Sequence, residues 1–447
     1  MAEDYSGPPR RHLVLVAVIA VLALTVLGGV VYLVFGIEPP NPDIIGDLVE
    51  QPTRDSIRPA RPPRERGPER KPAPVGRPAR LDRLARQVSD IRGIPLERRL
   101  RSRLLSTTAL ADKVSELAFD DQDPEEVADN ERLLVALRLA PVDVDLGGIL
   151  EDLYREQVLG VYVPEEETLY VARTGEVTPG QRSTTAHEIT HALQDQSFAI
   201  DKLQRRYEDD DDAALAVLSL IEGDAVLTQQ LWAQEYLTPE QQQQAANEGA
   251  GGEALARAPA YLRESLFFPY QHGGFFVAEL YRNGGHAAVD QAFRNPPTSS
   301  EQILHPERYR AGDEPVTVTV ARSPGRGWKR ATRYAFGEFD LRELLGNLGS
   351  GVAAEAGEGW DGGEVRSWSR GDATAVSSVL AFDTAEDAAE VCQALPEWYA
   401  HVAGGQPVGD GLYAGDRDHL AVACTDDRVR FAVAPASETA RLLVAAP

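Results

Sequence analysis

The chain has 447 residues with 45 basic and 70 acidic side chains, so its formal net charge at pH 7 is −25. Residues 1–103 hold 18 of the basic and 12 of the acidic side chains, which leaves residues 104–447 strongly acidic. An acidic surface repels anionic partners, and no fold-level nucleic-acid motif is present, so the sequence predicts no nucleic-acid partner. Its length leaves room for one large catalytic domain or two smaller domains.

The N-terminus is predicted to contain a single transmembrane helix at residues 13–36. Leu13 to Phe35 carries no charge and is long enough as a helix to cross ~30 Å of hydrocarbon. Arg10 and Arg11 precede it, whereas residues 36–53 contain no Lys or Arg. The positive-inside rule then makes residues 1–12 a cytoplasmic tail and places the rest outside a cell membrane. Against this orientation, residues 54–103 hold sixteen Arg or Lys, although they begin just beyond the flanking stretch in which the rule usually counts positive charges.

Residues 37–84 are predicted to be a Pro/Arg-rich linker, because residues 51–80 mix Pro, Arg and Gly without periodicity. Two interpretations stay open. The basic tract attracts anionic lipid head groups or wall polymers, or it is a solvated tether.

Residues 85–155 are predicted to be helical and to form the front of a catalytic unit. Leu159 to Val171 alternates and breaks at residues 164–167, which is typical of a β-hairpin. Thr178 followed by Pro179 predicts the start of a helix that runs to about Ser197.

That helix contains the pentapeptide His-Glu-Ile-Thr-His at residues 187–191. His187 and His191 are four residues apart, which places both imidazoles on one face of a helix and close enough to bind one metal ion. Glu188 can reach a metal-bound water without ligating the metal, and the pattern is the zinc-hydrolase signature. The plain alternative is a surface helix whose two histidines have ordinary hydrogen-bond partners and bind no metal.

Glu222 is the predicted third ligand. Residues 211–237 are predicted to form a second long helix, and Glu222 lies among apolar residues in its middle, so its charge needs a partner. Two His and one Glu leave a fourth position open, which is typical of catalytic zinc. The alternative, a Glu on the polar edge of a packed helix, leaves the neighbouring Gly223 unexplained.

Residues 186–196, together with Glu222-Gly223-Asp224-Ala225, resemble the gluzincin metallopeptidases. Within that group the chain is most similar to a bacterial and archaeal set with a Glu-Gly-x-Ala third-ligand motif. The resemblance covers roughly residues 85–400, and three further stretches fit it: Glu-Gln-Val-Leu-Gly-Val-Tyr at 156–162, Phe-Pro-Tyr at 268–270 and Ile-Leu-His-Pro-Glu at 303–307.

The resemblance implies Zn²⁺ as cofactor, a peptide or protein substrate, and a strand within Tyr162 to Val171 that lines the cleft and pairs with extended substrate. One position departs from the thermolysin-like pattern, since Val226 replaces an Asp. The carboxylate that would orient a ligating His must therefore come from elsewhere, and Asp195, one turn after His191, is the candidate.

The ligand set predicts hydrolysis by a metal-activated water, with Glu188 as general base. The developing oxyanion needs a donor. His305 and Tyr270 are the leading candidates, because each adjoins a proline and His305 is restricted by Pro306. Each could instead be a buried structural residue whose one polar group has a hydrogen-bond partner. His305 could also hold a buried carboxylate such as Glu307 or Glu301. The same segment also contains His272, Tyr281 and Tyr309.

Residues 311–370 are predicted to be rich in loops, with glycines over 357–363. They lead to a strand at 374–382, a helix at 384–399 and a hairpin about Asp426-Asp427. Cys392 and Cys424, on the helix and the hairpin, form either a disulfide or two buried thiols.

The sequence therefore predicts an α+β, mainly helical protein with a gluzincin-like catalytic domain at residues 85–310, a short hairpin or sheet before the metal helix, and a C-terminal α+β region at residues 311–447. The predicted function is that of a membrane-anchored zinc metallopeptidase. Two alternatives remain: a surface protein that keeps the fold for binding, which has no use for Glu188, and a metal hydrolase of non-peptide amides. Nothing in the sequence indicates an oligomeric state.

Overall fold

The computed structural model describes residues 77–119, 123–156, 159–173, 177–248 and 253–445. The predicted tail, the predicted transmembrane helix and most of the predicted linker lie outside these ranges. Among the described residues, no helix is both long and apolar enough to cross a bilayer.

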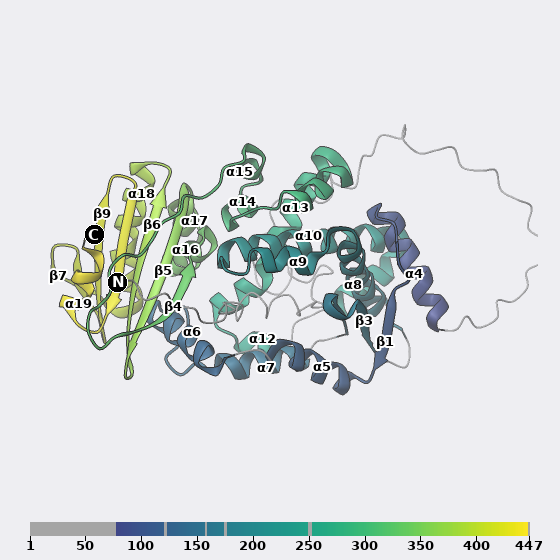
Figure 1. Ribbon diagram of the computed structural model, residues 1–447, viewed down its shortest axis with the longest axis horizontal. Coiled ribbons are helices and arrows are strands. Elements are labelled where there is room, and N and C mark those ends of the chain that lie inside the picture. The colour runs from purple at the N-terminus through teal and green to yellow at the C-terminus, as the bar shows by residue number, and fades with distance from the viewer. Residues whose placement is uncertain (1–76, 120–122, 157–158, 174–176, 249–252, 446–447) are drawn as a thin grey trace, which may run out of the picture.

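The described chain is a mainly helical α+β protein, as predicted, and Figure 1 shows two regions side by side. Helices dominate residues 77–311, the helical region, which also contains a three-stranded sheet. A seven-stranded antiparallel sheet dominates residues 312–445, the C-terminal region.

The small sheet of the helical region contains the predicted hairpin. Its strands are β1 (Arg101–Leu105), β2 (Gly160–Val163) and β3 (Thr168–Ala172), in the order β1-β3-β2. Strands β2 and β3 pair antiparallel around a 3₁₀ turn at Pro164–Glu166, which confirms the hairpin. Strand β1 falls where only helices were predicted. It is short, largely exposed and held by parallel pairing with a strand more than 60 residues away, so no local pattern announces it.

Among the described residues, four helices precede the His-Glu-x-x-His motif: α4 (Arg77–Arg92), α5 (Thr107–Phe119), α6 (Pro124–Ala136) and α7 (Leu146–Glu156). Helix α4 packs against the helix that carries this motif and against the helix that carries Glu222, and it begins inside the stretch predicted to be linker. Helix α6 places Leu133 in the core of the C-terminal region and so joins the two regions.

The two predicted metal-binding helices are α8 (Pro179–Phe198) and α10 (Asp211–Tyr236), with bounds close to those predicted. They pack against each other, and α10 also packs along α13 (Ala260–Arg294). Figure 1 shows α10 and α8 at the centre of the helical region. Shorter helices complete it: α9 (Ile200–Arg206), α11 (Pro239–Glu248), α12 (Glu253–Arg257), α14 (Ser300–Leu304) and α15 (Pro306–Ala311).

Helices α10 and α13 meet at a contact that only glycine permits. A Cβ on Gly223 would lie 2.1 Å from the carbonyl oxygen of Gly273, and a Cβ on Gly273 would lie 2.2 Å from the carbonyl oxygen of Ser219. Both distances are far inside van der Waals contact. This close crossing accounts for a glycine in the middle of α10, directly after Glu222.

The strands of the large sheet are β4 (Lys329–Ala335), β5 (Trp360–Arg370), β6 (Ala373–Phe382), β7 (Gln406–Gly409), β8 (Leu412–Ala414), β9 (His419–Thr425) and β10 (Arg428–Ala434). Their order in the sheet is β4-β5-β6-β10-β9-β8-β7.

The helices of the C-terminal region are α16 (Glu338–Leu345), α17 (Ser350–Gly357), α18 (Ala385–Ala403) and α19 (Ser437–Val444). The first three pack on one face of the sheet and α19 packs on the other. The predicted strand, helix and hairpin near the C-terminus are confirmed as β6, α18 and β9–β10.

The prediction that residues 311–370 are rich in loops was wrong for residues 329–370, which contain β4, α16, α17 and β5. The glycines mislead because they serve close packing. A Cβ on Gly363 in β5 would lie 2.2 Å from the carbonyl oxygen of Phe336, so the strand passes too near its neighbour for any side chain.

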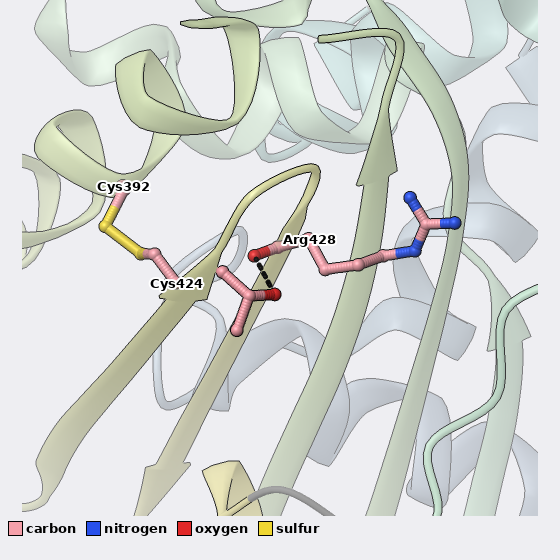
Figure 2. Close-up of a disulfide and its surroundings, with 4 residues drawn as sticks. Cys392, Cys424 and Arg428 are labelled. Atoms are coloured by element: carbon pink, nitrogen blue, oxygen red, sulfur yellow. Dashed lines mark hydrogen bonds between the residues drawn. A yellow bond between two sulfur atoms is a disulfide. The ribbon is translucent and has the colours of Figure 1, made fainter. Parts of the chain in front are cut away.

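Cys392 and Cys424 form a disulfide, which decides between the two alternatives left open by the sequence. Their Cα atoms are 6.3 Å apart, and the bond joins α18 to β9 across 32 residues (Figure 2). Figure 2 also shows the turn after Cys424, where the Thr425 hydroxyl donates to the carbonyl oxygen of Arg428 at 3.4 Å.

Candidate metal centre

The helix that carries the histidines is buried over the whole motif. Its N-cap is Thr178, whose hydroxyl accepts from the N–H of Gln181, with Pro179 at the first helical position, as predicted. Every residue from Ala186 to Gln194 is buried, so this is not a surface helix. Imidazoles and a carboxylate at such depth require partners, because an unpaired buried polar group costs free energy.

The two imidazoles and the Glu222 carboxylate form a triangle of donor atoms. The Nε2 atoms of His187 and His191 are 3.1 Å apart, and Glu222 Oε2 lies 3.0 Å from the first and 3.4 Å from the second. Tetrahedral zinc with bonds of ~2.0–2.1 Å separates its ligand atoms by about 3.3 Å. The three edges therefore match the spacing of three ligands around one such ion.

Glu188 lies beside this triangle. His187, Glu188 and His191 offer ligand atoms within 4.8 Å of one another, so the buried His-Glu-x-x-His group could hold a metal ion. One Glu188 oxygen accepts from the backbone N–H of Tyr162 in β2 at 2.7 Å. The other, Oε1, is buried and has no hydrogen-bond partner in the described part of the chain. A buried carboxylate oxygen in this state requires a cation or a water beside it.

The two carboxyl groups have opposite electrostatic character. Burial raises the pKa of Glu188 to about 8. Burial acts the same way on Glu222, but the His191 charge and the hydrogen bonds from both histidines lower its pKa to about 2. Burial disfavours the charge on His191 as well, yet the Glu222 carboxylate raises the His191 pKa to about 9. Glu222 is thus a fixed anion, whereas Glu188 can take up a proton near neutral pH.

Amides, and not carboxylates, orient the two histidines. His191 Nδ1 lies 2.9 Å from Gln194 Oε1, and the His187 imidazole is hydrogen-bonded to Gln229. The prediction that Asp195 orients a histidine was wrong, because Asp195 accepts instead from the Tyr162 hydroxyl at 2.8 Å. Both Gln194 and Asp195 lie about one turn from His191, so spacing alone could not separate them.

Of the five candidates for oxyanion donor, Tyr270 is the one that the structure brings to the cluster. Its buried ring lies on α13 and stacks on the His187 ring, with centroids 6.2 Å apart. The close crossing of α10 and α13 one turn away at Gly273 explains this position. Whether Tyr270 donates to an oxyanion stays a prediction.

His305 has other partners. Its Nε2 lies 3.0 Å from the buried carboxylate of Glu338 and 3.2 Å from the Arg342 guanidinium, where α14 meets α16. This matches the alternative that it holds a buried carboxylate, although the buried carboxylate is Glu338. The predicted Glu307 also lies 3.7 Å from His305 Nδ1, but its side chain is exposed. Its role as oxyanion donor stays a prediction from the sequence. The other candidates also contact groups outside the cluster: His272 contacts Phe268, Tyr281 contacts His286, and Tyr309 donates to the Asn295 carbonyl.

Comparison with known families finds one match. Residues 318–443 are similar to a domain of unknown function, DUF8575. The match covers most of the C-terminal region and none of the helical region. No curated protein and no solved structure matches the chain. The chemistry of the metal cluster therefore has to be argued from its own residues.

Proposed function

We propose that this protein is a membrane-anchored, zinc-dependent metallopeptidase of gluzincin type. The observation that carries the proposal is the triangle of His187, His191 and Glu222 with the partly unpartnered Glu188 carboxylate beside it. A zinc ion bound there would supply a polarised carbonyl and an activated water.

Glu222 is a better third ligand than Glu188. Its Oε2 completes the triangle at 3.0 and 3.4 Å, and its pKa keeps it anionic. Glu188 accepts from the Tyr162 N–H through one oxygen, which leaves only the other oxygen for the water. Two carboxyl groups with opposite pKa shifts in one site are typical of a divided acid–base role.

The chain's own groups then have distinct tasks. Glu188 Oε1 would accept the proton of the attacking water and return it to the leaving amine. The Tyr162 N–H holds Glu188 in place. Tyr270, against His187, is the candidate to stabilise the developing oxyanion, and the buried environment strengthens such an interaction.

The cellular location is also part of this proposal. The uncharged segment at residues 13–36 anchors the chain, and the helical and C-terminal regions lie outside the cytoplasm. The disulfide between Cys392 and Cys424 supports this placement, because such bonds persist mainly in oxidising compartments. Protease added to intact cells should degrade both regions. Protection until lysis would contradict this orientation.

The decisive experiment on function is Glu188→Gln in the full-length chain. The substitution keeps size and hydrogen bonding at Tyr162, so zinc content should stay near one per chain. Turnover of a peptide library should fall by about 10²–10⁴-fold. The matched control is Glu235→Gln, exposed near the C-terminal end of α10, which should keep full activity.

Each other outcome of this experiment has a definite meaning. Unchanged turnover in Glu188→Gln would remove the mechanism. Zinc binding without turnover of any peptide by the wild type would redirect the search to non-peptide amides.

A further inference from the structure

Arg92, Asp224 and Gln194 form a buried polar chain that leads from the N-terminal helix α4 to the metal cluster. The Arg92 and Asp224 side chains are fully buried and form an ion pair with Nε and Oδ1 2.6 Å apart. Gln194 Nε2 donates to Asp224 Oδ2 at 2.9 Å, and its Oε1 faces His191 Nδ1 at 2.9 Å. Arg92 also bonds Asp290 on α13 at 2.7 Å.

The orientation of the Gln194 amide follows from its partners. Its nitrogen lies 2.9 Å from both Asp224 Oδ2 and the carbonyl oxygen of Ile221, and a carboxylate and a carbonyl can only accept. Both amide hydrogens are thereby used. The side-chain oxygen must therefore face His191, where it can only accept a hydrogen bond.

This arrangement fixes which nitrogen of His191 keeps its proton. Nδ1 must donate to Gln194, whether the ring is neutral or charged, so the nitrogen available to a metal is Nε2. Nε2 is the atom that points into the triangle with His187 and Glu222.

The same amide also connects the two ligand-bearing helices. Gln194 lies on α8, whereas Ile221 and Asp224 flank Glu222 on α10. Its hydrogen bonds thus set the separation between His191 and Glu222. The fully buried Arg92–Asp224 ion pair costs desolvation free energy that apolar packing would not. More accurate positioning of the Gln194 amide is a physical reason for such a pair at this place.

We propose that Gln194, Asp224 and Arg92 are positioning residues that hold His191 and Glu222 in the geometry for a zinc ion. This inference rests on the proposed function only through the presence of a metal. It also makes α4 part of the site, although that helix starts within the predicted linker.

The test compares zinc affinity among full-length variants by competition with a chromogenic chelator. Gln194→Leu removes the amide at nearly constant volume and should weaken zinc binding by about 10–100-fold. Asp224→Asn keeps an acceptor for Gln194 but removes one of the two carboxylates that pair with Arg92, so we expect a smaller loss. The matched control is Gln196→Leu on the same helix, whose amide bonds the Arg98 backbone, and its affinity should be unchanged.

A second measurement separates positioning from general stability. The melting temperature of each variant is taken in excess chelator, and affinity is compared per folded molecule. Equal zinc affinity in wild type and Gln194→Leu, with only a lower melting temperature, would overturn the proposal. If Gln194→Leu does not fold, an unchanged zinc affinity in Asp224→Asn would overturn the proposal instead. A wild type that binds no zinc would instead refute the proposed function, and the positioning role with it.

Discussion

The helical and C-terminal regions bury polar side chains in different ways. In the helical region, imidazoles, carboxylates, amides and a guanidinium converge on adjacent turns of α8 and α10. In the C-terminal region the sheet faces bury mainly apolar side chains, and a disulfide ties a helix to a strand. Among the described residues, the His and Glu side chains close enough to share a metal lie in the helical region.

The difference teaches where chemistry should be sought. Burying charged groups is costly, so a concentrated polar network in one region indicates a site, whereas an apolar core with a covalent crosslink indicates a structural module. The family match falls on the second kind of region and the candidate site on the first. We therefore expect variants in the two regions to separate zinc binding from stability.

The largest effect should be loss of the metal. His187→Ala and Glu222→Ala should each reduce zinc from about one per chain to almost none, because two remaining ligands hold the ion weakly. The control is Glu364→Ala, which removes an equally buried carboxylate from the C-terminal region, where it pairs with Arg333. Elemental analysis of purified full-length protein measures the effect. Full zinc in Glu222→Ala would show that the third ligand is another residue.

For the disulfide we expect the opposite result, a loss of stability without a loss of zinc. Replacing both Cys392 and Cys424 by Ser removes a crosslink that closes 32 residues, which is worth about 3–4 kcal/mol in the free energy of unfolding. Thermal unfolding should show this loss, while zinc content stays unchanged. A parallel loss of zinc would mean that the C-terminal region supports the site directly.

The convergence of His187, His191 and Glu222 was largely predictable from the sequence, because helix geometry alone places the two histidines on one face and the apolar neighbours of Glu222 demand a partner for its charge. Gln194 was not predictable, since its selection over Asp195 depends on how α8 is rotated against α10. Tyr270 followed only from resemblance, because α13 meets the site through a long-range crossing at Gly223 and Gly273.

The C-terminal region shows the same division. The hairpin about Asp426-Asp427 and the helix at 384–399 have local signals and were predicted. Strand β5 was missed because its glycines resemble loop residues. Strand β4 contains no glycine, and it pairs with β5 beside the close backbone approach at Gly363, which no local pattern announces.

The glycine crossing gives a prediction of intermediate size. Gly223→Ala would place a methyl group 2.1 Å from a backbone oxygen of α13, so the helices must separate, at a cost of about 1–3 kcal/mol. Zinc affinity should fall as well, because Glu222 moves with α10. The matched control is Gly274→Ala, whose Cβ would lie 3.5 Å from Val226 in ordinary contact. Chemical denaturation and chelator competition measure both effects, and an unaltered Gly223→Ala would show that the crossing is not tight.

The smallest effect concerns the contact between the two regions and depends on pH. Asp340 on α16 is buried and accepts from the Tyr261 hydroxyl of α13 at 2.7 Å. Burial raises its pKa to about 6, above the usual value near 4, so the folded chain keeps this proton when the unfolded chain has lost it. Asp340 therefore favours folding at low pH, and this contribution is lost as pH rises from about 4 to about 6.

Asp340→Asn removes that titration, so the test is the change in melting temperature between pH 7 and pH 5. Wild type should gain stability from Asp340 on acidification, on the order of a few degrees, relative to Asp340→Asn. Asp372→Asn, in the exposed turn between β5 and β6, should follow wild type. If Asp340→Asn keeps the full wild-type pH dependence, Asp340 is ionised in the folded chain over this pH range. The pH dependence of the melting temperature then arises from another buried carboxyl group at the same contact, Asp211 or Asp212.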